Sequence, residues 1–284
     1  LYGAGIDYLD EFLQQAGCQV HTIHNYRDPL FGGSLPDPSA RGLHELAWQV
    51  RETGADLGLA LDGDADRFGV VDGDGTYIAA NEVLYLVLAH LLFHREYRGP
   101  VARTVATTHN LDRLASAHNL EIIETPVGFK YIGAALREQG CILGGEESGG
   151  LSIRGHIPEK DGILATALVA ELRAAGGRSL KEILAYLQGR YGRFVNRRLD
   201  LEVAPEVKAR VLKELPHWQP AGVGGVPVTG RLAIDGVKLL LADGSWVLLR
   251  PSGTEPLLRL YVEAPNDERL HLLQEEITSA LRIN

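Results

Sequence analysis

The stretch "DLGLALDGDADR", residues 56–67, joins a short apolar run to three aspartates at alternate positions. The apolar run predicts a β-strand with the aspartates at its C-terminal end, which is where open α/β sheets bind their ligands. Asp62, Asp64 and Asp66 repel one another if they converge on one point, and a hard divalent cation removes that repulsion. We therefore expect a metal site at this strand end, in preference to the alternative of a solvated acidic turn.

The pattern of these aspartates favours Mg²⁺ over Ca²⁺. A calcium-binding EF-hand loop that starts at Asp62 needs glycine at its sixth position and glutamate at its twelfth, where the chain has Arg67 and Gly73. Three protein oxygens leave coordination positions open for water or a phosphoryl oxygen, which suits Mg²⁺. The next acidic stretch, "VDGDGTY" at residues 71–77, is expected to be a solvated turn.

The segments around the aspartates predict an α/β architecture. From Gly5 to Gly140, segments with helical periodicity alternate with short β-like runs, which indicates βα units on a mostly parallel sheet. Two consecutive helices close this part of the chain. We predict helices at residues 6–16, 43–53, 81–97, 111–118, 128–140, 161–175 and 180–191, and strands at residues 18–24, 56–62, 100–108, 120–127 and 141–145.

The pattern changes after residue 191 to tightly spaced strands between helices. The dipeptides Asp235–Gly236 and Asp243–Gly244 favour hairpin turns, so an antiparallel sheet is expected here. The predicted fold class is therefore α/β, with two consecutive α/β mixed-sheet domains followed by a smaller α+β C-terminal domain. The expected domains are residues 1–80, 81–191 and 192–284.

Composition limits the classes of partner. The 284 residues carry a formal net charge of −9 and no Lys/Arg-rich block, so no nucleic-acid partner is expected. No apolar run reaches the roughly 20 residues that span a bilayer, and Cys18 and Cys141 are isolated. We expect a cytoplasmic protein with a small-molecule partner and no membrane anchor; the oligomeric state stays open. The chain contains no Met and opens on "LYGAGIDYL", which favours an incomplete polypeptide.

The motif "RPSGTEP", residues 250–256, follows an apolar strand and has the chemistry of a phosphate cradle. Arg250 offers a bidentate fork, Ser252 and Thr254 offer hydroxyls, and Gly253 lets the backbone turn its N–H groups inward. The same residues are also ordinary turn formers, so both interpretations stay open for this motif taken alone.

The motif "GGEESGG", residues 144–150, combines flanking glycines with Glu146 and Ser148, which could bind sugar hydroxyls. Glycine-rich loops with a few polar residues are common, so this signal is weak alone. Nearby segments add Lys130, His156 and Lys160, residue types that more often lie on the surface or in the core than on a ligand.

Taken together and in this order, "DGDADR", "GEESG" and "RPSGTEP" resemble the motifs of the α-D-phosphohexomutase family, which includes phosphoglucomutases and phosphomannomutases. The likeness covers essentially the whole chain and corresponds to family domains 2 to 4. It implies that the serine-bearing domain 1 and the first strand of domain 2 are missing. The three expected domains then become metal-binding (1–80), sugar-binding (81–191) and phosphate-binding (192–284).

The resemblance also implies a role for each motif residue. It implies Mg²⁺ ligation by Asp62, Asp64 and Asp66, and it places Arg67 beside the transferred phosphoryl group. "TPVGFK" resembles the segment that carries a catalytic-site lysine, which implies Lys130. The implied sugar-binding residues are Glu146, Ser148, His156 and Lys160, and the implied clamp on the other phosphate consists of Arg250, Ser252, Gly253 and Thr254.

The activity implied by the resemblance is an isomerase reaction of carbohydrate metabolism. Glucose 1-phosphate and glucose 6-phosphate would interconvert through a phosphoserine and a hexose 1,6-bisphosphate, with Mg²⁺ as cofactor. Glu147 in the sugar loop and "HIPEKDG" resemble the glucomutase branch more than the mannomutase branch. The mannomutase loop often ends in "SGH", and this chain has Gly150 in place of that histidine. A phosphomannomutase or a dual-specificity mutase is the alternative.

The main departure from the family is the absence of the serine that carries the phosphoryl group. This serine lies in a "TASHNP"-like loop that this sequence lacks, so the chain is expected to be inactive without an N-terminal domain. Two segments are similar to this loop, "TTHN" with Thr107 and Thr108 and "SAHN" with Ser116. The threonines match an ordinary strand end and Ser116 lies on a predicted helix, so none of the three is expected to carry the phosphate. The alternative from another class is a non-catalytic sugar-phosphate binding protein. A haloacid-dehalogenase-like phosphatase fits less well, because its Asp-x-Asp loop does not call for three aspartates followed by arginine.

Overall fold

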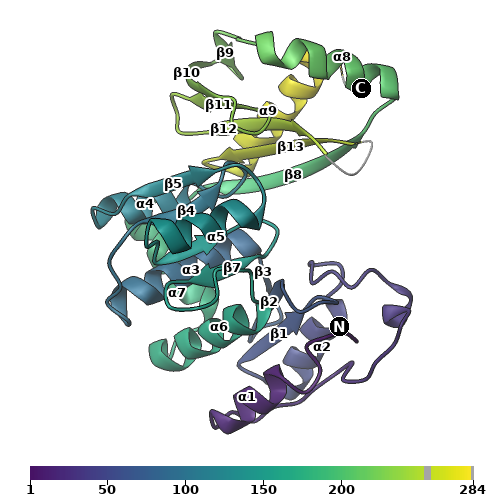
Figure 1. Cartoon of the computed structure of the whole chain (residues 1–284), viewed down its shortest axis with the longest axis vertical. Helices are drawn as coiled ribbons and strands as arrows, with labels where there is room; N and C mark the ends of the chain where they lie inside the picture. The colour runs from purple at the N-terminus through teal and green to yellow at the C-terminus, as the bar shows by residue number, and fades with distance from the viewer. Residues whose placement is uncertain (253–256, 283–284) are drawn as a thin grey trace. The chain divides into compact units, whose positions relative to one another are not determined.

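The predicted strand before the aspartates forms in the computed structural model as β1 (Leu57–Leu61). It pairs antiparallel with β2 (Phe68–Asp72), which pairs antiparallel with β3 (Tyr77–Ile78) (Figure 1). The pairing of Leu61 with Phe68 makes residues 62–67 the hairpin connection. The prediction of a mostly parallel sheet is therefore wrong here, because this connection returns the chain directly alongside β1 without a crossover helix.

The helix before β1 forms where its apolar stripe predicts it. α2 (His44–Thr53) ends at Gly54, which adopts a left-handed conformation with φ +66°, as glycine at a helix C-terminus commonly does. The preceding helix α1 (Leu9–Gln15) is shorter than predicted and buries only Leu13. A single 3₁₀ turn, η1 (Phe31–Gly33), lies between these two helices.

The predicted strand at residues 18–24 does not form. Among residues 1–252 and 257–282, which the structure describes, this segment pairs with no other strand. Its residues are mostly exposed or half-buried. An alternating pattern indicates a strand only where a neighbouring strand accepts its backbone hydrogen bonds, and the described chain supplies none.

The second sheet has the order β5-β4-β6-β7. Strands β4 (Val101–Thr104) and β6 (Leu143–Gly145) are parallel, whereas β6 and β7 (Leu151–Ile153) are antiparallel. The predicted mixed sheet is thus confirmed. The edge strand is β5 (Ile122–Thr125). In the sequence, helix α4 (Asn110–Ala117) connects β4 to β5, and helix α5 (Phe129–Glu138) connects β5 to β6.

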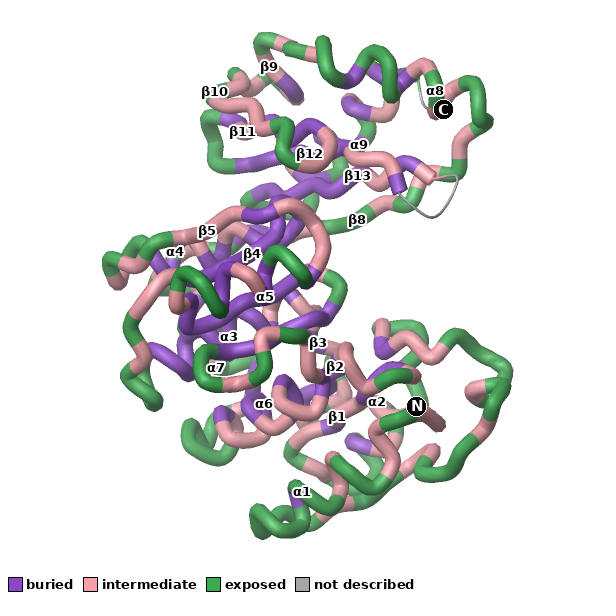
Figure 2. The backbone as a smooth tube through the Cα atoms, viewed as in Figure 1, coloured by how far each residue is buried: buried purple, intermediate pink, exposed green. Residues whose placement is uncertain are grey.

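Helix α3 (Ala80–Phe93) is the most buried helix of the first part of the chain (Figure 2). It is apolar on nearly every side and contacts β2, α6 (Gly162–Gly176) and α7 (Leu180–Tyr191). A helix that is hydrophobic all round belongs in the interior. These contacts join the aspartate-bearing sheet to the helices that follow the second sheet.

The acidic stretch at residues 71–77 is only partly the solvated turn that was expected. Asp74 is half-exposed and pairs with Lys181. Asp72, however, is 1% exposed and accepts hydrogen bonds from the backbone N–H groups of Leu180 and Lys181. Its carboxylate therefore satisfies the otherwise unpaired first N–H groups of α7.

The C-terminal part is an antiparallel six-stranded sheet with the order β8-β13-β12-β11-β10-β9, as predicted for an α+β fold. Gly236 and Gly244 take positive φ in the two hairpin turns, as the Asp-Gly pairs predict. Helix α9 contacts β13, and its buried leucines join the core of the sheet. The elements are β8 (Val195–Glu202), α8 (Pro205–Glu214), η2 (Leu215–His217), β9 (Gly222–Val223), β10 (Val226–Leu232), β11 (Val237–Leu241), β12 (Trp246–Pro251), β13 (Leu257–Ala264) and α9 (Asp267–Ala280).

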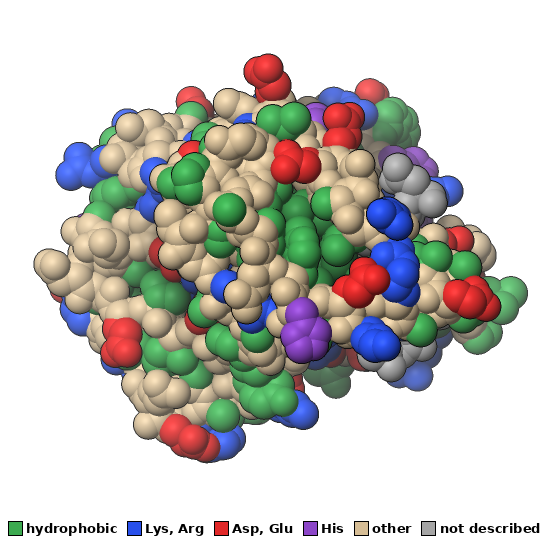
Figure 3. All heavy atoms as spheres, turned by 90° about the horizontal axis from the view of Figure 1, so that it is seen from above, with side chains coloured by type: hydrophobic (Ala, Val, Ile, Leu, Met, Phe, Trp, Pro, Cys, Tyr) green, Lys and Arg blue, Asp and Glu red, His purple; other side chains and the backbone are tan. Residues whose placement is uncertain are grey.

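Contacts divide the chain into two compact units. The first comprises Leu1–Thr107, Leu111–Glu124 and Gly128–Tyr191, and the second comprises Thr108–Asn110, Thr125–Val127 and Gly192–Asn284. The boundaries of three separate domains stay a prediction. No helix in the described part of the chain is long and apolar enough to cross a membrane. On the face shown in Figure 3, Lys and Arg side chains are interspersed with Asp and Glu side chains.

Candidate functional site

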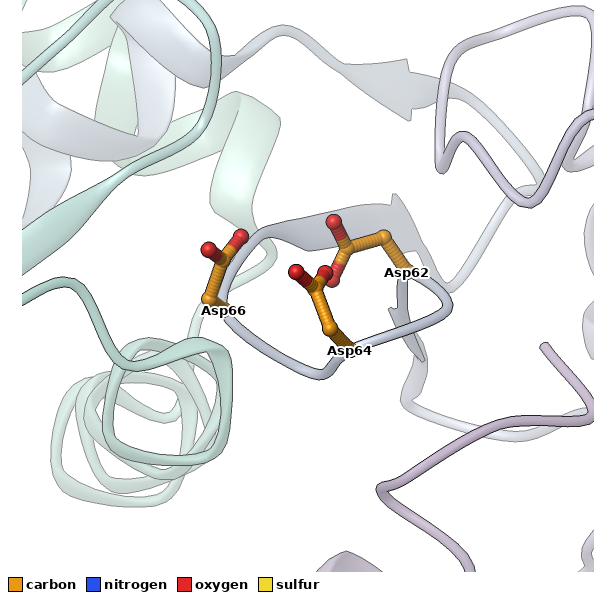
Figure 4. A group of neighbouring side chains, drawn as sticks. All are labelled: Asp62, Asp64 and Asp66. Atoms are coloured by element: carbon orange, nitrogen blue, oxygen red, sulfur yellow. The ribbon is translucent and has the colours of Figure 1, made fainter.

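The three aspartates converge in the loop that follows β1, residues 62–67, which we call the aspartate loop. One carboxylate oxygen from each of Asp62, Asp64 and Asp66 lies within 4.8 Å of the other two, and Figure 4 shows the side chains along one short loop. Ala65 turns the backbone through a left-handed conformation, with φ +63°. Side chains at alternate positions therefore reach a common point, as the sequence predicts.

Arg67 organises the start of the aspartate loop through Asp62. The Asp62 carboxylate is 1% exposed and accepts hydrogen bonds from the Arg67 backbone N–H at 3.0 Å and from Nε at 2.7 Å. Burial raises the pKa of Asp62, and the bonds from Arg67 oppose that rise. Arg67 also donates from Nη1 to Asp37 at 2.8 Å, a partner that sequence spacing could not reveal.

The residues present fit a hard divalent cation. All three converging groups are carboxylates, the oxygen ligands that Mg²⁺ prefers. Asp66 Oδ1 is buried and accepts no hydrogen bond within the described part of the chain, and such an orphaned acceptor costs free energy unless a partner binds it. Asp64 is exposed, which leaves one side of the cluster open to water or a phosphoryl oxygen.

The predicted sugar-binding motif, residues 144–150, forms a tight turn between β6 and β7, which we call the glutamate loop. Gly149 has φ +96°, and the backbone closes through a bond from Glu146 N to Gly150 O at 2.9 Å. The Glu146 side chain is 6% exposed and Oε1 accepts from Gly128 N at 2.8 Å. Burial raises the pKa of Glu146, against the bond from Gly128 and with repulsion from Glu147. Ser148 is exposed at the tip of the turn.

Sequence reasoning missed one anchor of the glutamate loop. Thr104, at the end of β4, donates from its hydroxyl to Glu147 Oε2 at 3.2 Å. It also shares a hydrogen bond of 2.9 Å with the hydroxyl of Thr107. The available signal was that Thr104 ends β4, a strand parallel to β6, and that Thr107 lies in the turn just after it, so both lie at the sheet edge where β6 ends.

The segment 155–162 contains two predicted sugar-binding residues, His156 and Lys160, and only Lys160 contacts the aspartate loop. Lys160 Nζ lies 2.5 Å from Asp66 Oδ2. His156 instead lies against Asp161, with Nε2 2.8 Å from Oδ2, while Asp161 Oδ1 accepts from Leu164 N at the start of α6. Lys160 thus joins the aspartate loop, and His156 supports the helix cap beside it.

Lys130, the predicted catalytic lysine, lies in the first turn of α5 and is exposed. Its Nζ is 4.8 Å from the centroid of the Tyr131 ring, a cation–π arrangement. No described ion pair connects it to the aspartate loop. Its assignment stays a prediction from the resemblance.

The predicted phosphate clamp lies in the second unit and is partly described. Arg250 Nη2 pairs with Asp235 Oδ2 at 3.0 Å, and Asp235 also accepts from Val127 N. Burial alone would lower the pKa of Arg250, but the charges of Asp235 and Tyr261 and their hydrogen bonds to the guanidinium together raise it. Ser252 is 6% exposed and donates its backbone N–H to Leu257 O at 3.0 Å. Gly253 and Thr254 lie outside the described residues.

Comparison with known proteins places these motifs in a family. Models described as phosphoglucomutase/phosphomannomutase match residues 1–75 (alpha/beta/alpha domain II), 79–191 (alpha/beta/alpha domain III) and 196–280 (C-terminal domain). A protein of Methanopyrus kandleri named "Probable phosphoglucosamine mutase" is 35% identical over 95% of this chain and 57% of its own length. A "Phosphoglucomutase/phosphomannomutase" of Thermococcus kodakarensis is 33% identical over 94% of this chain and 56% of its own length.

A solved structure supports the same assignment. The crystal structure of a phosphoglucomutase/phosphomannomutase family protein from Burkholderia thailandensis superposes with a TM-score of 0.83 at 26% identity, covering 99% of this chain and 58% of that one. The chain therefore spans less than two thirds of the length of these relatives. On these matches and on the motifs above, the chain belongs to the phosphoglucomutase/phosphomannomutase family, with segments that correspond to its domains II, III and IV.

Proposed function

We propose that this chain is the metal-, sugar- and phosphate-binding part of a phosphohexomutase that interconverts glucose 1-phosphate and glucose 6-phosphate. The observation that carries the proposal is the convergence of three carboxylates within 4.8 Å, beside Arg67 and in the same compact unit as Glu146. Phosphoryl transfer requires mainly positioning and neutralisation of charge on the transferred group. The described residues offer both kinds of chemistry.

Each group of residues has a separate task in this proposal. Asp62, Asp64 and Asp66 would hold Mg²⁺, which neutralises charge on the phosphoryl oxygens when it is bound. Arg67 is held by Asp62 and Asp37 with its side chain 34% exposed, so it can still reach a phosphoryl oxygen. Glu146 would accept hydrogen bonds from sugar hydroxyls, and Arg250 with Ser252 would bind the phosphate that is not transferred.

The phosphoryl carrier is proposed to lie outside residues 1–284. The family's serine loop is not found in this sequence, and the chain spans 57% of the length of the relative from Methanopyrus kandleri. We therefore propose that the chain acts as part of a longer polypeptide that supplies a phosphoserine. Transfer of the phosphoryl group from that serine to the hexose phosphate would form a hexose 1,6-bisphosphate, which reorients before it returns its other phosphate to the serine.

Binding of glucose 1,6-bisphosphate to the 284-residue chain tests the proposal by isothermal titration calorimetry with Mg²⁺. We expect saturable binding that weakens about tenfold or more in Glu146→Gln and in Arg250→Gln, because each loses a charge-assisted contact. Lys181→Met is the control, since the exposed Lys181 side chain pairs with Asp74 and Thr76, neither of which belongs to these motifs. No binding, or binding that neither substitution alters, would contradict the proposal.

Glucosamine 1-phosphate is a second candidate substrate, supported by the name of one relative and by the proximity of Glu147 to Glu146. The relative from Methanopyrus kandleri is named "Probable phosphoglucosamine mutase", and Glu147 lies close enough to Glu146 to raise its pKa. Two neighbouring carboxylates would attract the ammonium group of glucosamine phosphate. Turnover of glucose, mannose and glucosamine 1-phosphates by the native polypeptide distinguishes the three mutase activities, and the highest kcat/KM identifies the substrate.

A further inference from the structure

Lys160 pairs with one carboxylate oxygen of Asp66, and the other oxygen accepts no described hydrogen bond. Its Nζ lies 2.5 Å from Asp66 Oδ2. The other oxygen, Oδ1, is buried and accepts no hydrogen bond from any described group. Arg67 Nε lies 3.9 Å from Oδ1, beyond hydrogen-bond distance. One face of this carboxylate is therefore fixed, and the other is available to a ligand.

Backbone contacts fix the position of Lys160 relative to the aspartate loop. Gly162, two residues further on, donates its N–H to Ala65 O at 3.0 Å. A Cβ at Gly162 would lie 2.6 Å from Arg67 O and 2.8 Å from Ala65 O, so only glycine allows this approach. Asp161 N also donates to Leu151 O at 3.1 Å. The lysine thus projects from a segment that is bonded to the loop it contacts.

The aliphatic part of Lys160 packs against the glutamate loop. A Cβ placed on Gly150 would lie 3.3 Å from both Cβ and Cδ of Lys160. A side chain at position 150 would therefore press on the lysine. Gly150 leaves room for Lys160 to extend from the glutamate loop to Asp66, so a single side chain contacts both motifs.

Lys160 contacts only one of the three carboxylates. Within the described part of the chain it forms an ion pair with Asp66 and none with Asp62 or Asp64. An ammonium group that took the place of the metal would contact the converging oxygens of all three. The observed contact is instead the one expected of a group outside the metal site, an ion pair with the oxygen of Asp66 that orients the ligating carboxylate.

We infer that Lys160 is a positioning residue for the divalent ion, which holds Asp66 Oδ2 so that Oδ1 faces the ion. This inference rests on the metal site of the proposed function. It gives Lys160 a role different from the sugar contact implied by the resemblance. The inference predicts the direction in which removal of Lys160 changes the affinity for the divalent ion. A lysine that orients Asp66 raises this affinity, so its removal weakens binding. A lysine that only repelled or displaced the cation lowers the affinity, so its removal would strengthen binding.

The experiment is a titration of the metal-free 284-residue chain with Mn²⁺, in which electron paramagnetic resonance measures the free ion. Lys160→Met is expected to weaken Mn²⁺ binding by about 10-fold to 100-fold, the usual effect of removing a group that orients a metal ligand. Lys160→Arg retains a cationic donor and is expected to bind close to the wild-type value. Lys181→Met, which removes a similar Lys–Asp pair at Asp74, is the matched control and is expected to change nothing.

Two further measurements separate the possible failures. Thermal unfolding in EDTA should give similar midpoints for Lys160→Met and the wild type, which excludes a folding defect as the cause of weak binding. Asp66→Asn should abolish the Mn²⁺ site. If the wild type binds no Mn²⁺, the metal site itself is wrong and the inference fails with it. If Asp66→Asn abolishes binding but Lys160→Met leaves it unchanged or tighter, the metal site stands and the positioning role of Lys160 is overturned.

Discussion

Asp62 and Asp64 lie two residues apart in one loop, yet their surroundings differ sharply. Asp62 is 1% exposed and accepts two hydrogen bonds from Arg67, whereas Asp64 is exposed. A buried carboxylate with charged partners contributes to folding, because its removal leaves those partners without an acceptor. An exposed carboxylate that is aimed at a cation contributes mainly to binding that cation.

Substitution with asparagine should separate these contributions. Asp64→Asn is expected to weaken Mn²⁺ binding and leave the thermal midpoint of the metal-free chain unchanged. Asp62→Asn is expected to weaken binding and also to lower the free energy of unfolding by about 1 to 3 kcal/mol. The amide nitrogen that replaces Oδ2 cannot accept the hydrogen bond from Arg67 Nε, and this loss exceeds the gain from removing a buried charge. Denaturation in EDTA with a parallel Mn²⁺ titration measures both quantities. An equal loss of stability in the two variants would contradict the division.

Glu146 should make stability depend on pH in a defined direction. Burial raises its pKa above the ordinary 4.5, so ionisation is less favourable in the folded state than in the unfolded state. The resulting penalty is absent below pH 4.5 and grows as the pH rises through the raised value. Glu146→Gln should therefore be more stable than the wild type at neutral pH, and the difference should vanish toward pH 4. A difference that is constant from pH 4 to 8 would contradict the burial effect.

At the scale of elements, helix α6 begins where the aspartate loop needs glycine. Alanine normally stabilises a helix relative to glycine by about 0.5 to 1 kcal/mol. Gly189 in α7 has no described atom within 4 Å of an added Cβ, so Gly189→Ala should show that gain. Gly162→Ala should destabilise the chain and weaken Mn²⁺ binding, because its Cβ would lie 2.6 Å from Arg67 O. Chemical denaturation of both variants tests the contrast, and a gain at both positions would contradict it.

The elements that could be predicted from the sequence are those whose signal is local. Helix α7 has the predicted bounds, and the Asp-Gly pairs lie in the predicted hairpin turns. Strand β2 was not predicted, and its antiparallel pairing with β1 depends on how the aspartate loop reverses the chain. The absence of a strand at residues 18–24 could not be predicted either, because a strand needs a neighbouring strand to accept its backbone hydrogen bonds.

The same distinction holds for the candidate site. Regular spacing in one loop predicted the convergence of Asp62, Asp64 and Asp66. The groups that hold the motif residues come from distant segments and left no signal of this kind. Asp37 holds Arg67, Thr104 holds Glu147 and Asp235 holds Arg250. Such partners depend on the tertiary fold, which a single sequence does not display.

In the proposed function, substrate binding and phosphoryl transfer depend on different parts of the polypeptide. The chain offers groups suited to metal, sugar and phosphate, while the proposed carrier serine belongs to a longer polypeptide. Residues 1–284 alone should therefore bind glucose 1,6-bisphosphate without isomerising glucose 1-phosphate. Isomerisation by the isolated chain, or stoichiometric phosphoserine within it, would contradict this division.

³¹P NMR of glucose 1-phosphate incubated with the native polypeptide and Mg²⁺ tests the proposed phosphohexomutase activity. We expect the resonance of glucose 6-phosphate to appear without that of inorganic phosphate, and we expect Asp64→Asn in the same polypeptide to slow this conversion strongly. Release of inorganic phosphate alone would indicate a phosphatase. An unchanged spectrum with tight binding of glucose 1-phosphate would indicate a non-catalytic sugar-phosphate binding protein, and either result would contradict the account.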